Sequence, residues 1–159
     1  MEIIVLGGMD MKGEKVRVIL WGIGAMGKGM AEMLLDKKGV EIVGVVGRTY
    51  RLGKSMYEYL DVERGDRPDI IIGEYDEVIQ EGAADIVLIS TNSFVADSFD
   101  KIKYCLEKKI NVISTAEEMA YPYAQEPELS KEMDRLAKEN NVSVLGTGIN
   151  PGLIMDLLV

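Results

Sequence analysis

One glycine-rich hexapeptide in the sequence has residue types and a spacing that could bind a phosphate group. It consists of Gly22, Ile23, Gly24, Ala25, Met26 and Gly27. In this GxGxxG pattern the first glycine permits a tight turn, the second lets the backbone approach a pyrophosphate, and the third lets a helix pack closely on a strand. A helix that begins inside the loop presents free N–H groups and the positive end of its dipole to the anion. The hexapeptide therefore indicates binding of the pyrophosphate of NAD or NADP, and a glycine-rich turn without a ligand is the alternative.

The segment after the next apolar run bears on which of the two cofactors would bind. An NAD-selective site usually has Asp or Glu at the end of its second strand, to accept hydrogen bonds from the ribose 2′-OH. Here residues 46–51 read Val-Gly-Arg-Thr-Tyr-Arg, without an acid. Arg48 could pair with a 2′-phosphate and stack on the adenine, while Thr49 donates its hydroxyl; a solvated basic loop is the alternative. We therefore expect NADP to bind at least as well as NAD.

Small polar residues follow a later apolar run, where contact with the ribose and the nicotinamide would be made. Residues 90–93 read Ser-Thr-Asn-Ser. We expect Thr91 and Asn92 to line the cofactor site. Ser93 is placed to cap the helix that begins near Phe94.

Two further segments hold the candidates for substrate contact. Residues 114–118 end in two carboxylates, which in a first helical turn normally interact favourably with the helix dipole. We expect that role for the pair, and the alternative is that Glu117 faces a substrate ammonium group. Residues 146–152 (Gly-Thr-Gly-Ile-Asn-Pro-Gly) must form an irregular backbone, beside the nicotinamide if the segment follows the last strand. Asn150 could then hydrogen-bond the substrate or the cofactor amide.

Apolar strand-like runs alternate along the chain with amphipathic helical segments, and these elements would position the candidate residues. The expected strands are 16–20, 40–46, 70–72, 86–89, 111–113 and 142–145, and the expected helices are 25–38, 76–80, one near 95–106 and one from 127. Such alternation is typical of a parallel sheet with helices on both faces. The predicted fold class is α/β, a doubly wound parallel sheet of about six strands, which is a Rossmann fold in a single domain.

Methionines recur along the first expected helix at helical spacing. Met26, Met30, Met33 and Leu34 lie at i, i+4, i+7 and i+8. We expect this stripe to be the face that packs in the core.

Composition excludes several classes of function. A net charge of −9 argues against nucleic acid as a partner, because a binder needs a basic surface. With no histidine and a single cysteine, a metal site is not expected. No apolar run has the length of a membrane span or the flanks of a signal peptide, and the lone cysteine fits a reducing compartment, so the expected location is the cytoplasm.

The two ends suggest how the domain is bounded. We expect residues 1–15 to be an extension, 16–146 to be the NAD(P)-binding Rossmann domain, and 147–159 to begin the connection to a substrate domain that is missing here. In the absence of that domain, the apolar segment 153–159 would be exposed and prone to association.

Three of these segments together resemble a known family. Residues 18–27, 114–118 and 146–152, with Asp156, resemble the N-terminal half of the 2,4-diaminopentanoate dehydrogenases. That family belongs to the wider group with a dihydrodipicolinate reductase-like NAD(P)-binding domain. The resemblance implies oxidative deamination of a small amino acid in ornithine breakdown, with 2,4-diaminopentanoate converted to 2-amino-4-oxopentanoate, ammonia and NAD(P)H.

The same resemblance implies a second domain that binds substrate and completes a homo-oligomer. Any catalytic acid or base in that half is missing here, so we identify no catalytic residue and expect cofactor binding with little turnover. Two alternatives stay open. One is a dihydrodipicolinate reductase-like imine reductase, against which the Asn-Pro-Gly sequence argues. The other is a stand-alone dinucleotide-binding module with a regulatory role.

Overall fold

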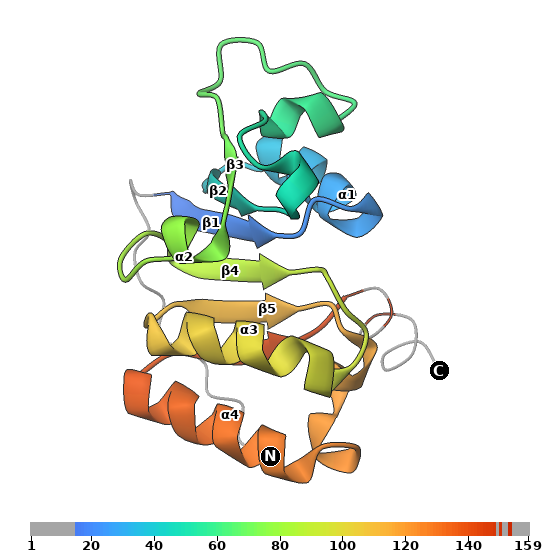
Figure 1. The fold of residues 1–159 in the computed structure, drawn as a ribbon, viewed down its shortest axis with the longest axis vertical. Helices are drawn as coiled ribbons and strands as arrows, with labels where there is room; N and C mark the ends of the chain where they lie inside the picture. The colour runs from blue at the N-terminus through green and yellow to red at the C-terminus, as the bar shows by residue number, and fades with distance from the viewer. Residues whose placement is uncertain (1–14, 149, 151–152, 154–159) are drawn as a thin grey trace.

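A parallel sheet of six strands forms the centre of the computed structural model, which describes residues 15–148, 150 and 153 (Figure 1). The strands are β1 (Val16–Trp21), β2 (Val40–Val46), β3 (Ile72–Gly73), β4 (Ile86–Ile89), β5 (Asn111–Ser114) and β6 (Val144–Gly146). Their order is β3-β2-β1-β4-β5-β6, and every neighbouring pair is parallel. The direction of winding therefore reverses between β1 and β4, which is the switch point of a doubly wound fold. The predicted fold class is confirmed.

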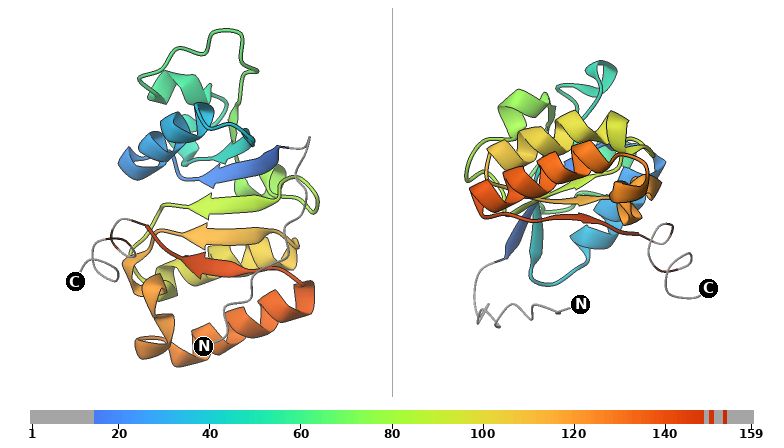
Figure 2. Two further views of the ribbon diagram at one scale, coloured as in Figure 1. Left: turned by 180° about the vertical axis from the view of Figure 1, so that it is seen from behind. Right: turned by 90° about the horizontal axis from the view of Figure 1, so that it is seen from below.

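Helices cover both faces of this sheet. They are α1 (Ala25–Leu35), α2 (Tyr75–Val78), α3 (Val95–Glu107) and α4 (Pro127–Asn140). Figure 2 shows α3 and α4 on one side of the sheet and α1 on the other. The core accordingly consists of two apolar clusters, one beneath α3 and α4 and one beneath α1. Because all strands run the same way, their carboxyl ends share one edge, and the loops that carry the predicted site residues meet there.

Two strands begin later than predicted, because backbone groups at their predicted starts form hydrogen bonds with other segments. Residues 70 and 71 pair outside the sheet: the Ile70 carbonyl accepts from Met56 N, and Ile71 forms an antiparallel bridge with Ser55. Val142 was expected to begin the last strand, but its N–H closes the end of α4 by donating to the Ala137 carbonyl at 2.9 Å. The strands therefore begin at Ile72 and Val144.

The expectation for the stripe on α1 is wrong for Met26 and Met33, whereas Met30 is half-buried and Leu34 packs against the core. Met26 and Met33 are 60% and 65% exposed, whereas Gly27 and Ala31 are the buried residues of the helix. The face of α1 that packs on the sheet is formed by Gly27 and Ala31 in its first two turns and by Leu34 and Leu35 in its last. Hydrophobicity alone therefore places the centre of the buried face wrongly, because it overlooks the small residues.

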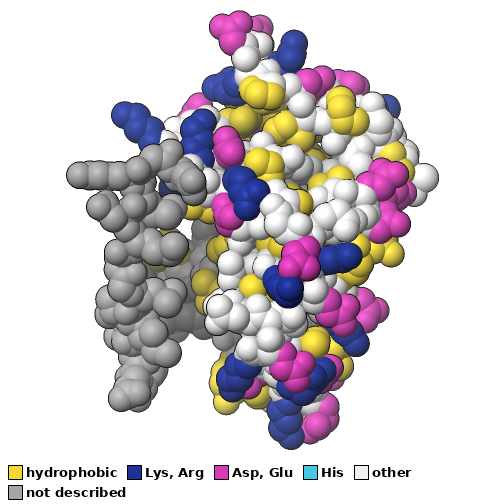
Figure 3. Space-filling view, turned by 90° about the vertical axis from the view of Figure 1, so that its left-hand side faces the viewer, with side chains coloured by type: hydrophobic (Ala, Val, Ile, Leu, Met, Phe, Trp, Pro, Cys, Tyr) yellow, Lys and Arg dark blue, Asp and Glu magenta, His cyan; other side chains and the backbone are white. Residues whose placement is uncertain are grey.

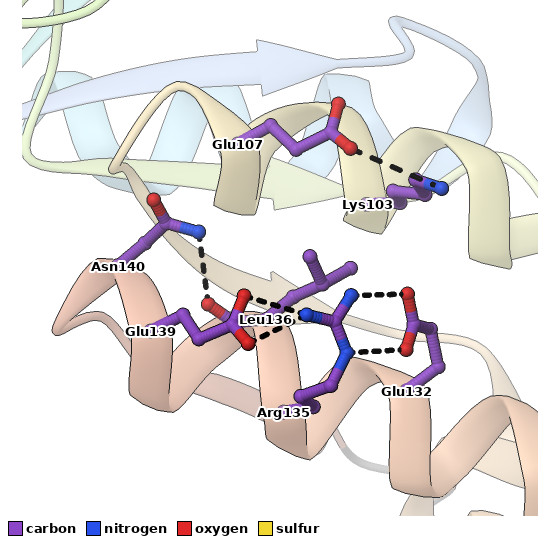
Figure 4. A network of polar contacts seen from close by, with 7 residues as sticks. All are labelled: Lys103, Glu107, Glu132, Arg135, Leu136, Glu139 and Asn140. Carbon is purple, nitrogen blue, oxygen red and sulfur yellow. Dashed lines mark hydrogen bonds and ion pairs between the residues drawn. The ribbon is translucent and has the colours of Figure 1, made fainter.

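Charged side chains of both signs are interspersed on the edge opposite the predicted site, at the amino ends of the strands (Figure 3). On α4, Arg135 donates to the carboxylates of Glu132 and Glu139, and α3 carries a further pair between Lys103 and Glu107 (Figure 4). The hydrogen bonds from Arg135 hold the pKa of Glu132 below its usual value. Such exposed pairs contribute little to stability.

Asp85 joins β1 to β4 at this edge and is expected to make stability depend on pH. Its carboxylate accepts from the Arg17 guanidinium at 2.9 Å and from Arg17 N at 2.7 Å. The Arg17 guanidinium holds the pKa of Asp85 below its usual range. The carboxylate therefore stabilises the fold above the ordinary aspartate pKa, and this contribution is lost as the pH falls through the lowered value.

We expect Asp85→Asn to lower the free energy of unfolding at pH 7 by about 0.5 kcal/mol, because both side chains are partly exposed to solvent. Urea unfolding of both proteins at pH 7 and in acid checks this result. The difference should disappear in acid, and a difference that is the same at both pH values would contradict the assignment.

No helix within the described part of the chain is long and apolar enough to cross a membrane.

The glycine loop and the candidate cofactor site

The glycine loop connects β1 to α1 at the carboxyl edge of the sheet. Gly22 has φ +111°, a conformation that residues with side chains rarely adopt, and its N–H donates to the Val46 carbonyl at 2.9 Å. A Cβ built on Gly27 would lie 1.9 Å from the Gly22 carbonyl oxygen. The turn and the close packing that the sequence predicted for these two glycines are therefore both present.

Gly24 faces open space, since a Cβ built on it would meet nothing within 4 Å. Beside it is a cavity of about 540 Å³, in the size range of small-molecule sites. The residues that line it are Trp21, Gly22, Ile23, Gly24, Val46, Gly47, Arg48, Tyr50, Arg51, Ser90, Thr91, Asn92 and Lys101. A cavity at the N-terminus of α1, with a cationic side chain on each side of the glycine loop, suits a dinucleotide. The residues present fit NAD(P).

Two arginines follow β2, and the structure gives them different roles. Arg51 donates to the Ile23 carbonyl, and its guanidinium carbon lies 4.6 Å from the centre of the Tyr59 ring and 5.2 Å from that of Tyr50. Arg51 therefore ties the loop after β2 to the glycine loop, which the sequence did not predict. For the Arg48 side chain, which is exposed at the cavity, no hydrogen bond or ion pair is recorded with the described residues. Arg48 is thus the arginine left to meet a ligand.

The loop after β4 forms the other wall of the cavity. Thr91 and Asn92 line it, as expected, together with Ser90 and with Lys101 from α3. Lys101 donates to Asn92 Oδ1 at 2.7 Å. Sequence reasoning missed Lys101, because a lysine on the polar side of a helix gives no sign of the loop that it contacts.

Ser93 does not cap α3, so that prediction is wrong. The N-cap residue is Phe94, which forms no side-chain cap, and Glu118 accepts from Val95 N at 2.9 Å instead. Glu118 N also donates to the Ser93 carbonyl at 3.2 Å. The acidic pair was expected to act on its own helical turn, but Glu118 satisfies the N-terminus of a different helix. Glu117 is exposed.

We expect Glu118→Ala to lower the free energy of unfolding by about 1 kcal/mol, as the loss of a helix cap does. Glu117→Ala is the matched control, because it removes the same charge at an exposed neighbouring residue. It should change the free energy of unfolding by less than about 0.5 kcal/mol. Chemical denaturation measures both. Equal effects of the two substitutions would show that Glu118 does not cap α3.

The remaining predicted residues are not among those that line the cavity. They are Ala25, Met26, Gly27 and Thr49 for the cofactor, and Glu117 and Asn150 for the substrate. Asn150 is exposed, and the residues on both sides of it lie outside the described part of the chain. Gly146 has a packing role, since a Cβ on it would lie 2.1 Å from the Met119 carbonyl oxygen.

Trp21, the single tryptophan of the sequence, ends β1 and lines the same cavity. Its ring stacks on Tyr75 with centres 5.6 Å apart. A tryptophan at this position gives binding experiments an intrinsic fluorescent reporter.

No cluster of His, Cys, Asp and Glu suited to a metal ion occurs among residues 15–148, 150 and 153. Cys105 is buried, which raises the pKa of its thiol to about 12 and keeps it protonated at neutral pH. What the site offers is backbone N–H groups, hydroxyls, an amide and cations around an open cavity. That set is suited to an anionic dinucleotide.

The fold and the site together define a dinucleotide-binding Rossmann domain. Residues 16–147 match the oxidoreductase family with an NAD-binding Rossmann fold, and the chain belongs to this family. The domain is therefore of the NAD(P)-binding kind found in this oxidoreductase family.

Individual relatives are similar over most of this chain. The 2,4-diaminopentanoate dehydrogenase of Acetoanaerobium sticklandii is 70% identical over 146 residues, which are 92% of this chain and 41% of the relative. An amine dehydrogenase from Mycobacterium smegmatis is 34% identical with a TM-score of 0.76, over 86% of this chain and 40% of that one. Biliverdin reductase from Synechocystis, solved with biliverdin and NADP+, shares the fold at 20% identity and a TM-score of 0.59, over 81% of this chain and 37% of that one. The chain thus spans less than half the length of each relative.

Proposed function

We propose that this chain is the cofactor-binding part of an amine dehydrogenase that oxidatively deaminates 2,4-diaminopentanoate. The observation that carries the proposal is the 70% identity to a dehydrogenase of that name across the residues that build the glycine loop and its cavity. The overall reaction takes the protonated amine, NAD(P)+ and water to a ketone, ammonium, NAD(P)H and a proton. When bound, the cofactor accepts the hydride from the carbon that carries the amine.

The chain's own residues bind and orient the cofactor in this proposal. The free N–H groups at the start of α1, beside Gly24, hold the pyrophosphate. Arg48 pairs with the 2′-phosphate of NADP, with Thr49 beside it, so that NADP binds at least as tightly as NAD. Thr91 and Asn92 lie against the other half of the dinucleotide.

Substrate contacts in the proposal come from Glu117 and Asn150 and from a second domain. Glu117 has an exposed carboxylate on the turn after β5, at the same edge of the sheet as the glycine loop, where it can meet an ammonium group. We place the start of the connection to the substrate domain at residues 147–159, since the relative is more than twice as long as the matched region. The complete enzyme would be a cytoplasmic homo-oligomer that acts on a small amino acid.

A chimaera tests this proposal. The chain is joined to the remaining C-terminal part of the A. sticklandii dehydrogenase and supplied with NADP+ or NAD+ and 2,4-diaminopentanoate. We expect formation of reduced cofactor and release of ammonium by the chimaera, and cofactor binding with little turnover by the chain alone. A folded chimaera that binds NADP but does not oxidise the diamine would contradict the substrate assignment.

A further inference from the structure

The side chain of Asn92 is held by two donors that converge on one of its atoms. Lys101 Nζ donates to Asn92 Oδ1 at 2.7 Å, and Thr91 Oγ1 lies 2.6 Å from the same oxygen. A lysine ammonium can only donate, so the amide atom that faces it must be the carbonyl oxygen. The contact with Lys101 therefore decides which way round the carboxamide lies.

This orientation leaves the NH2 end of Asn92 available. Within residues 15–148 no partner is recorded for Asn92 Nδ2, although the residue is half-buried and lines the cavity. An amide NH2 that faces an open cavity is free to donate a hydrogen bond to an oxygen of a bound ligand.

Lys101 is itself fixed in the wall of the cavity. Its ammonium also donates to the Asp97 carbonyl at 2.9 Å, one turn back along α3. Burial lowers the pKa of Lys101 below its usual value, while the nearby Asp97 and Asp100 raise it. The ammonium is thus partly withdrawn from water and hydrogen-bonded at two points, which distinguishes it from a freely solvated surface lysine.

Strand order shows which part of the cofactor lies near Asn92. In the order β2-β1-β4, the glycine loop follows the middle strand, Arg48 follows β2 and Asn92 follows β4. With the pyrophosphate at the glycine loop and the 2′-phosphate at Arg48, the nicotinamide half extends toward the loop after β4.

We infer that Lys101 is a positioning residue, which fixes the Asn92 carboxamide so that its NH2 group donates to an oxygen of the nicotinamide half of NAD(P). The inference rests on the cofactor site proposed above. Lys101 acts through Asn92 and makes no contact of its own with the cofactor.

Calorimetric titration of the 159-residue chain with NADP tests this role through a double-mutant cycle. Lys101→Met keeps the apolar stem and removes the donor, and we expect it to raise the Kd about 5-fold, the worth of one hydrogen bond. Asn92→Ala should raise the Kd by a similar factor. The double variant should bind no more weakly than Asn92→Ala alone.

A second ligand, 2′,5′-ADP, separates this role from general damage to the fold. It carries the adenine half of NADP and lacks the nicotinamide, so its Kd should change less than about 2-fold in all three variants, since none of its contacts is removed. Thermal unfolding of each variant accompanies the titrations.

Each other result overturns the inference. Additive effects would mean that Lys101 contacts the cofactor directly, and equal weakening of 2′,5′-ADP would mean that it only maintains the fold. An unchanged Kd for NADP in Lys101→Met would exclude the role while leaving the cofactor site intact. Failure of the unsubstituted chain to bind either nucleotide would remove the cofactor site and the inference together.

Discussion

Replacement of Gly27 by alanine is expected to abolish cofactor binding and to lower the free energy of unfolding by about 3 kcal/mol. The new Cβ would lie 1.9 Å from the carbonyl oxygen of Gly22 and 2.8 Å from its carbonyl carbon. Both atoms belong to the backbone, so neither can move aside as a flexible side chain would. Relief of the clash requires α1 to shift from the sheet, and the N–H groups that bind the pyrophosphate shift with it.

Gly29→Ala is the matched control for this prediction, because it makes the same chemical change two residues further along α1. A Cβ there would meet nothing within 4 Å. We expect this variant to be more stable by about 0.5 to 1 kcal/mol, since alanine favours the helix, and to bind NADP as before. Urea unfolding and calorimetry measure both variants. A Gly27→Ala protein that binds NADP normally would refute the assigned role of the close packing.

The second large effect is expected from Arg48, whose loss should cost selectivity for NADP. Arg48→Ala should raise the Kd for NADP about 30-fold, which corresponds to about 2 kcal/mol for a charge-assisted hydrogen bond. The Kd for NAD should change less than about 2-fold, because NAD has no 2′-phosphate to lose a partner. Calorimetric titration with each cofactor gives both values.

Lys54→Ala controls for the change in net charge. Lys54 is exposed on the same segment but is not among the residues that line the cavity. The Lys54→Ala variant should bind NAD and NADP with dissociation constants within about 2-fold of those of the unsubstituted chain, since long-range effects of one surface charge are screened by salt. Equal weakening of NAD and NADP by Arg48→Ala would show that the arginine contacts a part common to both.

Much of this site could be predicted because its signals are local in sequence. Gly22 and Gly27 are needed for a backbone conformation and a packing distance that only glycine permits, so the residue types themselves reveal the geometry. Strands with nearly continuous apolar runs were also predictable. All residues of β4 are buried or half-buried, as are residues 44–46 of β2, whereas Val43 is 40% exposed.

Other features depend on neighbours that are distant in sequence, and no local pattern indicates them. Glu118 caps a helix that begins at Val95, and Lys101 orients a side chain of the preceding loop. Arg51 was visible as a basic residue, but its contact with the Ile23 carbonyl comes from the pairing of β1 with β2. The prediction for Met26 and Met33 failed for a related reason, since the close approach of α1 to the sheet at Gly27 turns these two side chains to the solvent.

The most direct test of the central claim is a crystal structure of the chain with NADPH. We expect the pyrophosphate at the N-terminus of α1 beside Gly24, the 2′-phosphate within hydrogen-bonding distance of Arg48, and the nicotinamide half against the loop that contains Asn92. A nucleotide bound elsewhere, or no nucleotide in the cavity at saturating concentration, would contradict the assignment of this glycine loop as the cofactor site.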